Sequence, residues 1–162
     1  MVVLSDPPAF RKKGTIEIED LVIPRDLHFY QGDTMLMVSY LNHGVVCWDL
    51  ATGDTLWQIE PRHDHSGHSA FSPSGKWIAV FNLSSGIDIY SVQDQRRIKT
   101  LPINLDQNNN VPMQIAFVKG GKEILSGAHY GALRIWDVES GNPVQRLGHK
   151  GRFRSDSAPY EG

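Results

Sequence analysis

A single cysteine, the absence of long apolar runs and the lack of excess positive charge limit what this chain can be. Cys47 lies in an apolar stretch, so it cannot form an internal disulfide, and we expect it to act as a small buried hydrophobe. No run approaches the roughly 18 apolar residues that suggest a membrane span, and the N-terminus lacks the basic start of a signal peptide. The net charge of −2 provides no basic field for nucleic acid. We therefore expect an intracellular protein of the cytoplasm or nucleus, with neither a membrane nor nucleic acid as its partner.

Helical periodicity and familiar enzyme motifs are also missing. The segments between proline and glycine residues are short and rich in β-branched and aromatic residues, which favours strands. The sequence has no Gly-x-Ser-x-Gly, no His-Glu-x-x-His and no phosphate-binding Gly-Lys-Ser/Thr loop. Gly120-Gly121-Lys122 lacks the spacing of such a loop and predicts a hairpin turn. We expect a non-enzymatic protein without a cofactor.

What the sequence does contain is a phrase that recurs three times, at 46–50, 87–92 and 133–138. Trp48, Tyr90 and Trp136 hold the same place in the three copies, at steps of 42 and 46 residues. A second phrase, Phe-Ser-Pro-Ser-Gly at 71–75, recurs 46 residues later as Phe-Val-Lys-Gly-Gly at 117–121. A fixed period of this size predicts a repeat architecture.

Each period contains several short runs that are separated by glycine, proline, serine and asparagine. In the third period we expect strands near 113–118, 123–126, 132–138 and 144–147. The runs 35–38 and 77–81 are apolar on consecutive residues, which predicts strands buried on both faces. The run 96–101 is polar and suits an outer, solvated strand. Four strands in each period, running from buried to exposed, are typical of one propeller blade.

These residues resemble the WD-repeat family of β-propellers. Trp48-Asp49 and Trp136-Asp137 resemble the dipeptide that names the family, Phe71-Ser72-Pro73-Ser74-Gly75 resembles its first turn, and Leu147-Gly148-His149 resembles its Gly-His element. Tyr90 takes the tryptophan position in the second unit. The resemblance implies an all-β fold, a partial propeller of three four-stranded antiparallel blades that cannot close a ring. It also implies a non-catalytic scaffold that binds other proteins through blade loops and exposed blade faces.

The units depart from the family pattern at the turn before the third strand. The family often carries aspartate there, within a hydrogen-bonded tetrad, whereas this chain has His43, Ser85 and Tyr130. Ser39 and Ser126 stand where the second-strand hydroxyl would lie. We expect incomplete tetrads in all three units and the loss of a buried polar partner for Trp136, a loss worth about 1 kcal/mol.

The expected organisation has three parts. An N-terminal segment, 1–24, holds one possible strand at 15–19, and a disordered tail covers 150–162. Between them, 25–149 holds repeats at about 25–60, 67–101 and 112–147. Three blades fall short of the four that a closed ring needs, so an apolar sheet face is left open at each end. We expect part of a longer propeller or an arc completed by another chain, and a truncated gene product is the remaining possibility.

Three further segments could carry a site. His63, His65 and His68 could bind a metal ion or support a metal-assisted enzyme, which is the alternative function. Their spacing is not a standard zinc pattern, and we prefer to interpret them as part of a solvated loop between two blades. The basic runs at 11–13 and 150–154 could contact phosphate, but they suit solvated termini. The polar stretch 104–110 predicts an exposed loop and a protein contact.

Overall fold

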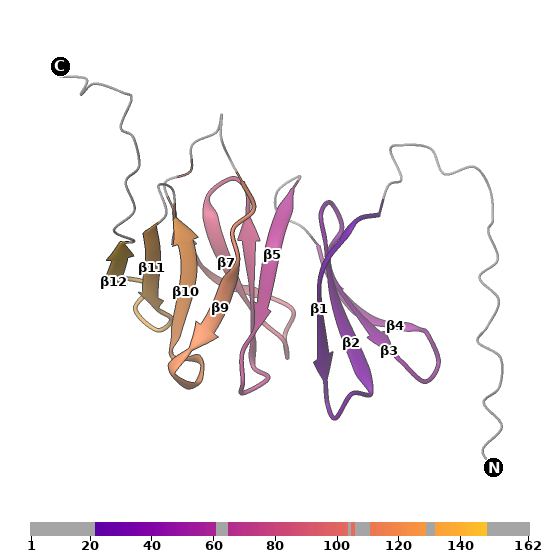
Figure 1. Cartoon of the computed structure of the whole chain (residues 1–162). Helices are drawn as coiled ribbons and strands as arrows, with labels where there is room; N and C mark the ends of the chain where they lie inside the picture. The colour runs from indigo at the N-terminus through magenta and orange to yellow at the C-terminus, as the bar shows by residue number, and fades with distance from the viewer. Residues whose placement is uncertain (1–21, 61–64, 104, 106–110, 129–131, 149–162) are drawn as a thin grey trace, which may run out of the picture.

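Three four-stranded sheets are stacked side by side in the computed structural model, which describes residues 22–60, 65–103, 105, 111–128 and 132–148 (Figure 1). The first sheet holds β1 (Pro24–Tyr30), β2 (Met35–Tyr40), β3 (Gly44–Asp49) and β4 (Thr55–Ile59). The second holds β5 (Ser66–Phe71), β6 (Trp77–Asn82), β7 (Gly86–Ser91) and β8 (Arg97–Pro102). The third holds β9 (Ile115–Val118), β10 (Glu123–Ala128), β11 (Ala132–Asp137) and β12 (Pro143–Gly148), with the short 3-10 turn η2 (Lys119–Gly121) between its first two strands.

Within each sheet, every strand pairs in antiparallel fashion with the next strand of the sequence, so each sheet is a simple meander. The expected all-β fold of three four-stranded antiparallel blades, which do not close a ring, is confirmed. The possible strand at 15–19 and the tail at 150–162 lie outside the described residues, as do the two basic runs. Within the described ranges, no helix is long and apolar enough to cross a membrane.

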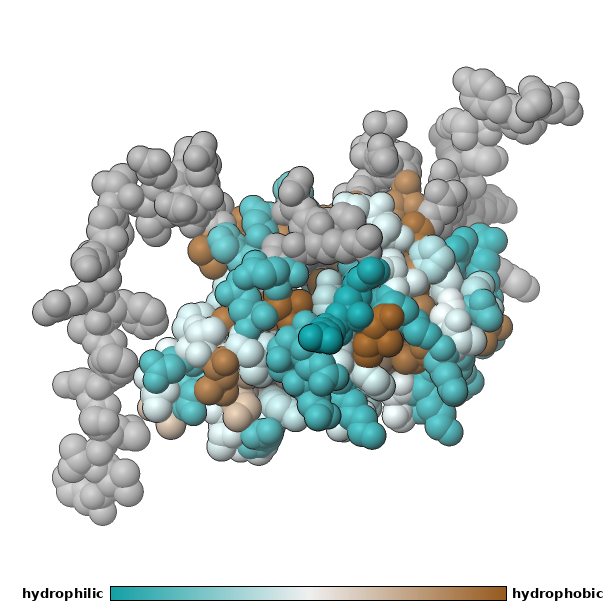
Figure 2. Space-filling model, turned by 180° about the vertical axis from the view of Figure 1, so that it is seen from behind, coloured by the Kyte–Doolittle hydropathy of each residue, from teal (hydrophilic) through white to brown (hydrophobic). Residues whose placement is uncertain are grey.

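The second sheet lies between the other two and is covered on both sides (Figure 1). Strand β7 is buried at all six positions, and β6 is buried at five of its six. The consecutive apolar residues that predicted such strands therefore have a physical cause, because each face of the sheet packs on a neighbour. The fourth strands differ: β8 is partly exposed and β12 is exposed throughout. Seen from behind in Figure 2, the molecule is largely hydrophilic, with a few separate hydrophobic groups.

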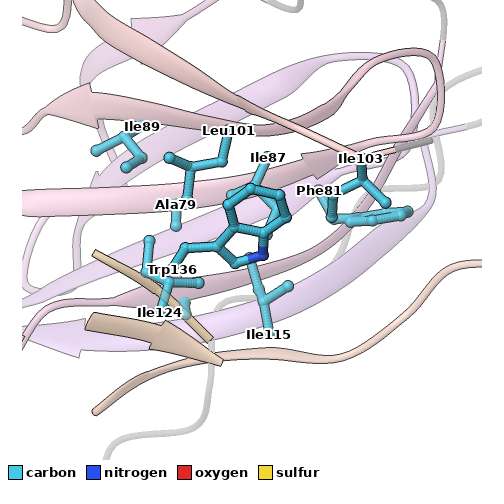
Figure 3. Close-up of a cluster of buried hydrophobic side chains, with 10 residues drawn as sticks. Ala79, Phe81, Ile87, Ile89, Leu101, Ile103, Ile115, Ile124 and Trp136 are labelled. Atoms are coloured by element: carbon cyan, nitrogen blue, oxygen red, sulfur yellow. The ribbon is translucent and has the colours of Figure 1, made fainter. Parts of the chain in front are cut away.

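Two hydrophobic clusters join the sheets. The cluster between the first and second sheets contains Met37, Val45, Cys47 and Ile59 on one side and Ile78, Val80, Tyr90 and Val92 on the other. The cluster between the second and third sheets is centred on Trp136, whose indole lies among aliphatic side chains of both sheets (Figure 3). Cys47 is fully buried, as expected, and burial raises the pKa of its thiol. The core of this protein thus lies between its sheets.

The three sheets repeat one another residue by residue. In each, a backbone N–H just after the third strand bonds the carbonyl of the residue just before the second strand. These bonds join Leu50 to Thr34, Val92 to Lys76 and Val138 to Lys122, at 3.0, 2.9 and 2.9 Å. The third-strand signature residues also share one register, in the pairs Leu36–Trp48, Ile78–Tyr90 and Ile124–Trp136. The steps of 42 and 46 residues can therefore be used to match positions between sheets.

Replacement of Gly86 should destabilise the fold more than replacement of any other glycine described by the structure. Its φ is +136°, and a Cβ atom there would lie 2.1 Å from the carbonyl oxygen of Leu101 on the neighbouring strand. Gly86→Ala should lower the free energy of unfolding by about 3 kcal/mol or more, because two paired backbones would have to separate. The control is Gly53→Ala, where φ is +77° and the space is open, and it should cost about 1 kcal/mol. Urea denaturation measures both; equal losses would contradict the clash.

Candidate interaction surface

The side chains of each sheet project from two faces, and the signature aromatic lies on the face toward the preceding sheet. Tyr90 packs in the cluster shared with the first sheet, and Trp136 packs in the cluster shared with the second. Trp48 occupies the matching position in the first sheet. It follows Cys47, which faces the second sheet, and alternate residues of a strand point to opposite faces. Trp48 therefore belongs to the face of the first sheet that points away from the second.

The outer face of the first sheet, which we term the leading face, carries large apolar residues on its first three strands and just after the third. Leu27 is 61% exposed, Phe29 is 59% exposed and Leu50 is 45% exposed, although all three are large hydrophobic residues. Their equivalents in the second sheet, by contrast, pack on the first sheet or bond to it. The leading face consists of Leu27, Phe29, Leu36, Val38, Trp48 and Leu50.

Phe29 is the member of this face that the sequence interpretation missed. It precedes Phe71 by 42 residues, and Phe71 precedes Phe117 by 46, which are the same steps that relate the signature aromatics. Phe71 packs edge-on against Tyr30 of the first sheet, with the ring centroids 5.2 Å apart. Phe117 packs against the cluster between the second and third sheets. Both equivalents of Phe29 are thus held against a preceding sheet, and the 42-residue step was the signal that could have identified it.

The outer face of the third sheet, which we term the trailing face, is its counterpart. It carries apolar residues at the positions that the second sheet buries against the third, and two of them, Leu133 and Leu147, are about two-fifths exposed. Glu123 takes the place that Trp77 has in the second sheet, and its Oε2 atom is buried without a hydrogen-bond partner among the described residues. The apolar members of the trailing face are Leu125, Leu133, Ile135 and Leu147.

Two grooves run between the sheets at the end that carries the turns after the first and third strands. One, of about 860 Å³, lies between the first and second sheets and includes Trp57 and Arg96 in its lining. The other, of about 550 Å³, lies between the second and third sheets and includes Lys122. Trp77 and Ile98 line both grooves. Both grooves combine aromatic side chains with charged ones, and aromatic residues are enriched at protein interfaces.

The aspartates of the two Trp-Asp pairs close turns rather than act on a ligand. The Oδ1 atom of Asp49 accepts a hydrogen bond from the backbone N–H of Ala51 at 2.7 Å. The Oδ1 atom of Asp137 accepts one from Ser140 at 2.7 Å, and this backbone bond lowers the pKa of the Asp137 carboxyl. Both carboxylates therefore cap the turn between the third and fourth strands.

His68 is engaged with Asp26 in a polar network between the first and second sheets. Its Nδ1 atom lies 3.1 Å from Oδ2 of Asp26, and the same oxygen accepts the backbone N–H of Ser69 at 2.7 Å. The hydroxyl of Ser69 accepts a bond from the Ser39 hydroxyl at 2.7 Å and lies 2.8 Å from Nε2 of His28. This network binds β1 and β2 to β5.

The three histidines proposed for a metal ion do not form a site in the part of the chain that the structure describes. His68 contacts Asp26, His65 is exposed, and His63 lies outside the described residues. Among the described residues, no three His, Cys, Asp or Glu side chains gather closely enough to hold a metal ion. The polar stretch 104–110, proposed as a partner contact, also lies outside the described residues except for Leu105. Leu105 packs on the hydrophobic cluster between the second and third sheets.

The expectation that Trp136 lacks a buried polar partner was wrong. Its indole N–H donates to the Ser126 hydroxyl at 3.3 Å, and the side chains of both residues are buried. The error came from treating the tetrad as a unit. Ser126 lies on the neighbouring strand β10, two positions from the register partner of Trp136, so the hydroxyl reaches the indole without help from the turn.

The second sheet has a buried polar network that sequence reasoning also missed. Asn82 accepts backbone N–H bonds from Ser85 at 2.6 Å and from Gly86 at 3.1 Å, which caps the turn between β6 and β7. Its Nδ2 atom donates to Asp88, which is 1% exposed, at 2.7 Å. Arg97 lies 3.7 Å from the other Asp88 oxygen. A buried carboxylate needs such partners because its transfer from water is costly.

Replacement of Ser126 by alanine should show that the Trp136 bond contributes to stability. The indole N–H would stay buried without an acceptor, so Ser126→Ala should lower the free energy of unfolding by about 1–3 kcal/mol. Ser140→Ala, at an exposed turn position, is the matched control and should cost less than about 0.5 kcal/mol. Both are measured by chemical denaturation followed through tryptophan fluorescence. Equal effects of the two changes would contradict the bond.

Stability should fall as the pH drops because of His28. Burial lowers the pKa of its imidazole, while Asp26 and Ser69 partly oppose the shift. Below the unfolded pKa near 6.5, the unfolded chain takes up a proton that the folded chain resists, so the free energy of unfolding decreases toward pH 5.5. His28→Gln, which keeps an N–H near Ser69, should flatten this decrease, whereas His65→Gln at an exposed site should leave it. Denaturation at pH 7.5, 6.5 and 5.5 checks both; identical slopes would contradict the assignment.

Comparison with known proteins supports the architecture. No family model matches the chain. A WD repeat-containing protein of Schistosoma mansoni, SL1-17, is 22% identical over 129 residues, which cover 80% of this chain and 42% of that protein. The guanine nucleotide-binding protein subunit beta-5b of Danio rerio is 27% identical over 134 residues, which cover 80% of this chain and 34% of that protein. The chain therefore spans less than half the length of these relatives.

Solved structures show the same likeness in three dimensions. The structure of U3-55K matches with a TM-score of 0.64 at 20% identity, over 79% of this chain and 40% of that one. The WD40 repeats of RRP9 match with a TM-score of 0.65 at 21% identity, over 79% of this chain and 39% of that one. The stacked sheets, their repeated register and these likenesses together show that the chain has the fold of three blades of a WD40-type β-propeller and is similar to WD-repeat proteins.

Proposed function

We propose that this chain is a non-catalytic scaffold that binds other proteins, and that the leading face is its principal contact. The observation that carries the proposal is the exposure of Phe29 and Leu27 beside Trp48, on a face whose equivalents in the other two sheets are covered. Large apolar side chains that are exposed next to one another on a surface are typical of interaction sites. Aromatic anchors within such a patch supply most of the binding energy of protein interfaces.

The grooves between the sheets provide a second kind of contact surface. Their lining combines aromatic side chains with charged residues of both signs, so an extended segment of another protein could place apolar and polar side chains there. The charged residues include Lys76, Arg96, Lys122, Asp94, Asp137 and Glu139. The relatives support this reading: one is named as a repeat protein and the other as a subunit. We infer an intracellular location from the same resemblance.

Site-specific photo-crosslinking tests the proposed contact. A photoreactive phenylalanine analogue at position 29 should form covalent adducts with another polypeptide in cells. The analogue at Thr52, an exposed turn residue outside both end faces, should form few or none. Adducts in equal yield at both positions, or none at position 29, would contradict the proposal.

A further inference from the structure

The leading and trailing faces are the two halves of an interface that the molecule already contains twice. Between the first and second sheets, and again between the second and third, the trailing side of one sheet packs on the leading side of the next. Among the described residues, no other sheet packs on the leading face of the first sheet or on the trailing face of the third, and these two faces lie at opposite ends of the stack (Figure 1). Each chain thus exposes one copy of each half.

We propose that the occupant of these faces is a second copy of this chain, and that two copies close a ring of six sheets. This inference rests on the proposed function, since it names the partner at the leading face. The third sheet of one copy would pack on the first sheet of the other, and the reverse contact would be identical to it. Six sheets lie within the four to eight that propellers use.

Residue-by-residue equivalence makes the second copy a matched partner. Phe71 and Tyr90 on the second sheet pack against the first sheet, and their equivalents on the leading face are Phe29 and Trp48. Ile87 and Leu101 are fully buried against the third sheet, and their equivalents on the trailing face are Leu133 and Leu147. Every uncovered apolar position on either face thus has an equivalent that is covered by a sheet within this chain.

A closed two-fold dimer would also bury both the leading and the trailing face of each copy. A head-to-tail contact that does not close continues into a filament, whereas a closed one leaves no face free. With two copies, each leading face meets one trailing face. The ring would then expose the fourth strands, of which β12 is exposed throughout and β8 in part.

Glu123 provides a charged group through which the strength of this contact can be altered. Its equivalents, Met35 and Trp77, line grooves together with Lys76 and Lys122 respectively. The residue that matches these lysines in the first sheet is Thr34, as the shared backbone hydrogen bonds show. In the six-sheet ring, Glu123 of one copy would therefore lie at a groove beside Thr34 of the other. Oε1 of Glu123 already pairs with Lys119 at 2.7 Å, whereas its Oε2 has no hydrogen-bond partner among the described residues. Thr34→Lys would supply a second cation near Oε2, and Thr34→Glu would repel the carboxylate.

Sedimentation velocity of the purified chain, over a range of concentrations, tests the ring. We expect a particle of twice 18.2 kDa. Phe29→Lys on the leading face and Leu133→Lys on the trailing face should each yield folded monomers, because each destroys both contacts. Mixed together, these two variants should form a heterodimer, because one wild-type leading face then meets one wild-type trailing face. Thr34→Lys should tighten the wild-type dimer by about two- to fivefold per contact, and Thr34→Glu should weaken it.

Circular dichroism of each variant establishes that monomers arise from lost contacts and not from unfolding. A wild-type chain that stays monomeric, or that grows into filaments, overturns the ring. A dimer that Phe29→Lys disrupts but Leu133→Lys leaves intact overturns it too, because the leading faces would then contact each other. A monomer that still crosslinks to a different protein through position 29 overturns the ring alone and leaves the scaffold function standing.

Discussion

The structure depends on one constraint, which is that its sheets are apolar on both faces and need a neighbour on each side. Strand β7 is buried along its whole length, which a sheet with one face in water cannot achieve. Burial of apolar surface contributes roughly 25 cal/mol per Å², so an uncovered sheet of this kind gives up a large part of its stabilisation. Among the described residues, the middle sheet has a neighbouring sheet on both faces, whereas each outer sheet has one on a single face.

The buried polar groups add specificity to these apolar contacts. The network around Ser69 joins β1 and β2 to β5, and it fixes how the first sheet sits on the second. Asn82 and Asp88 act within the second sheet, where they hold the turn that leads into its most buried strand. Apolar packing would tolerate small slips between sheets, but a displaced hydrogen bond leaves a buried group unpaired. The buried polar contacts of the described residues thus differ from one sheet to the next.

Much of the architecture could be predicted from the sequence because the same turn chemistry recurs at each period. Gly53 and Gly141 have positive φ angles at matching places after the third strand, where glycine is favoured. Side chains that pair across the sheets were much harder to foresee. Asp26 and His68 lie 42 residues apart, and no local pattern links them. A histidine cluster was therefore considered for a metal ion when one of its members bonds a carboxylate of another sheet.

Asp88 and Phe29 show two other limits of local patterns. Asp88 lies between two isoleucines in β7, and these neighbours do not indicate that Asn82 will hydrogen-bond its buried carboxylate. Phe29 lies between His28 and Tyr30, and these flanking residues differ from those of Phe71. The equivalence of Phe29 and Phe71 is therefore visible only in their separation of 42 residues. The sequence interpretation could predict uncovered faces, but it could not name their residues without the register.

The polar outer strands have a consequence for the directions in which this molecule can grow. A free strand edge invites another chain to extend the sheet through backbone hydrogen bonds, but β12 begins with a proline and carries Gln145 and Arg146 in solvent. Lateral extension is therefore discouraged, while the apolar faces favour addition along the stacking axis. The polar residues of β12 thus disfavour amyloid-like strand pairing at this edge. Assembly through the apolar sheet faces is not affected by them.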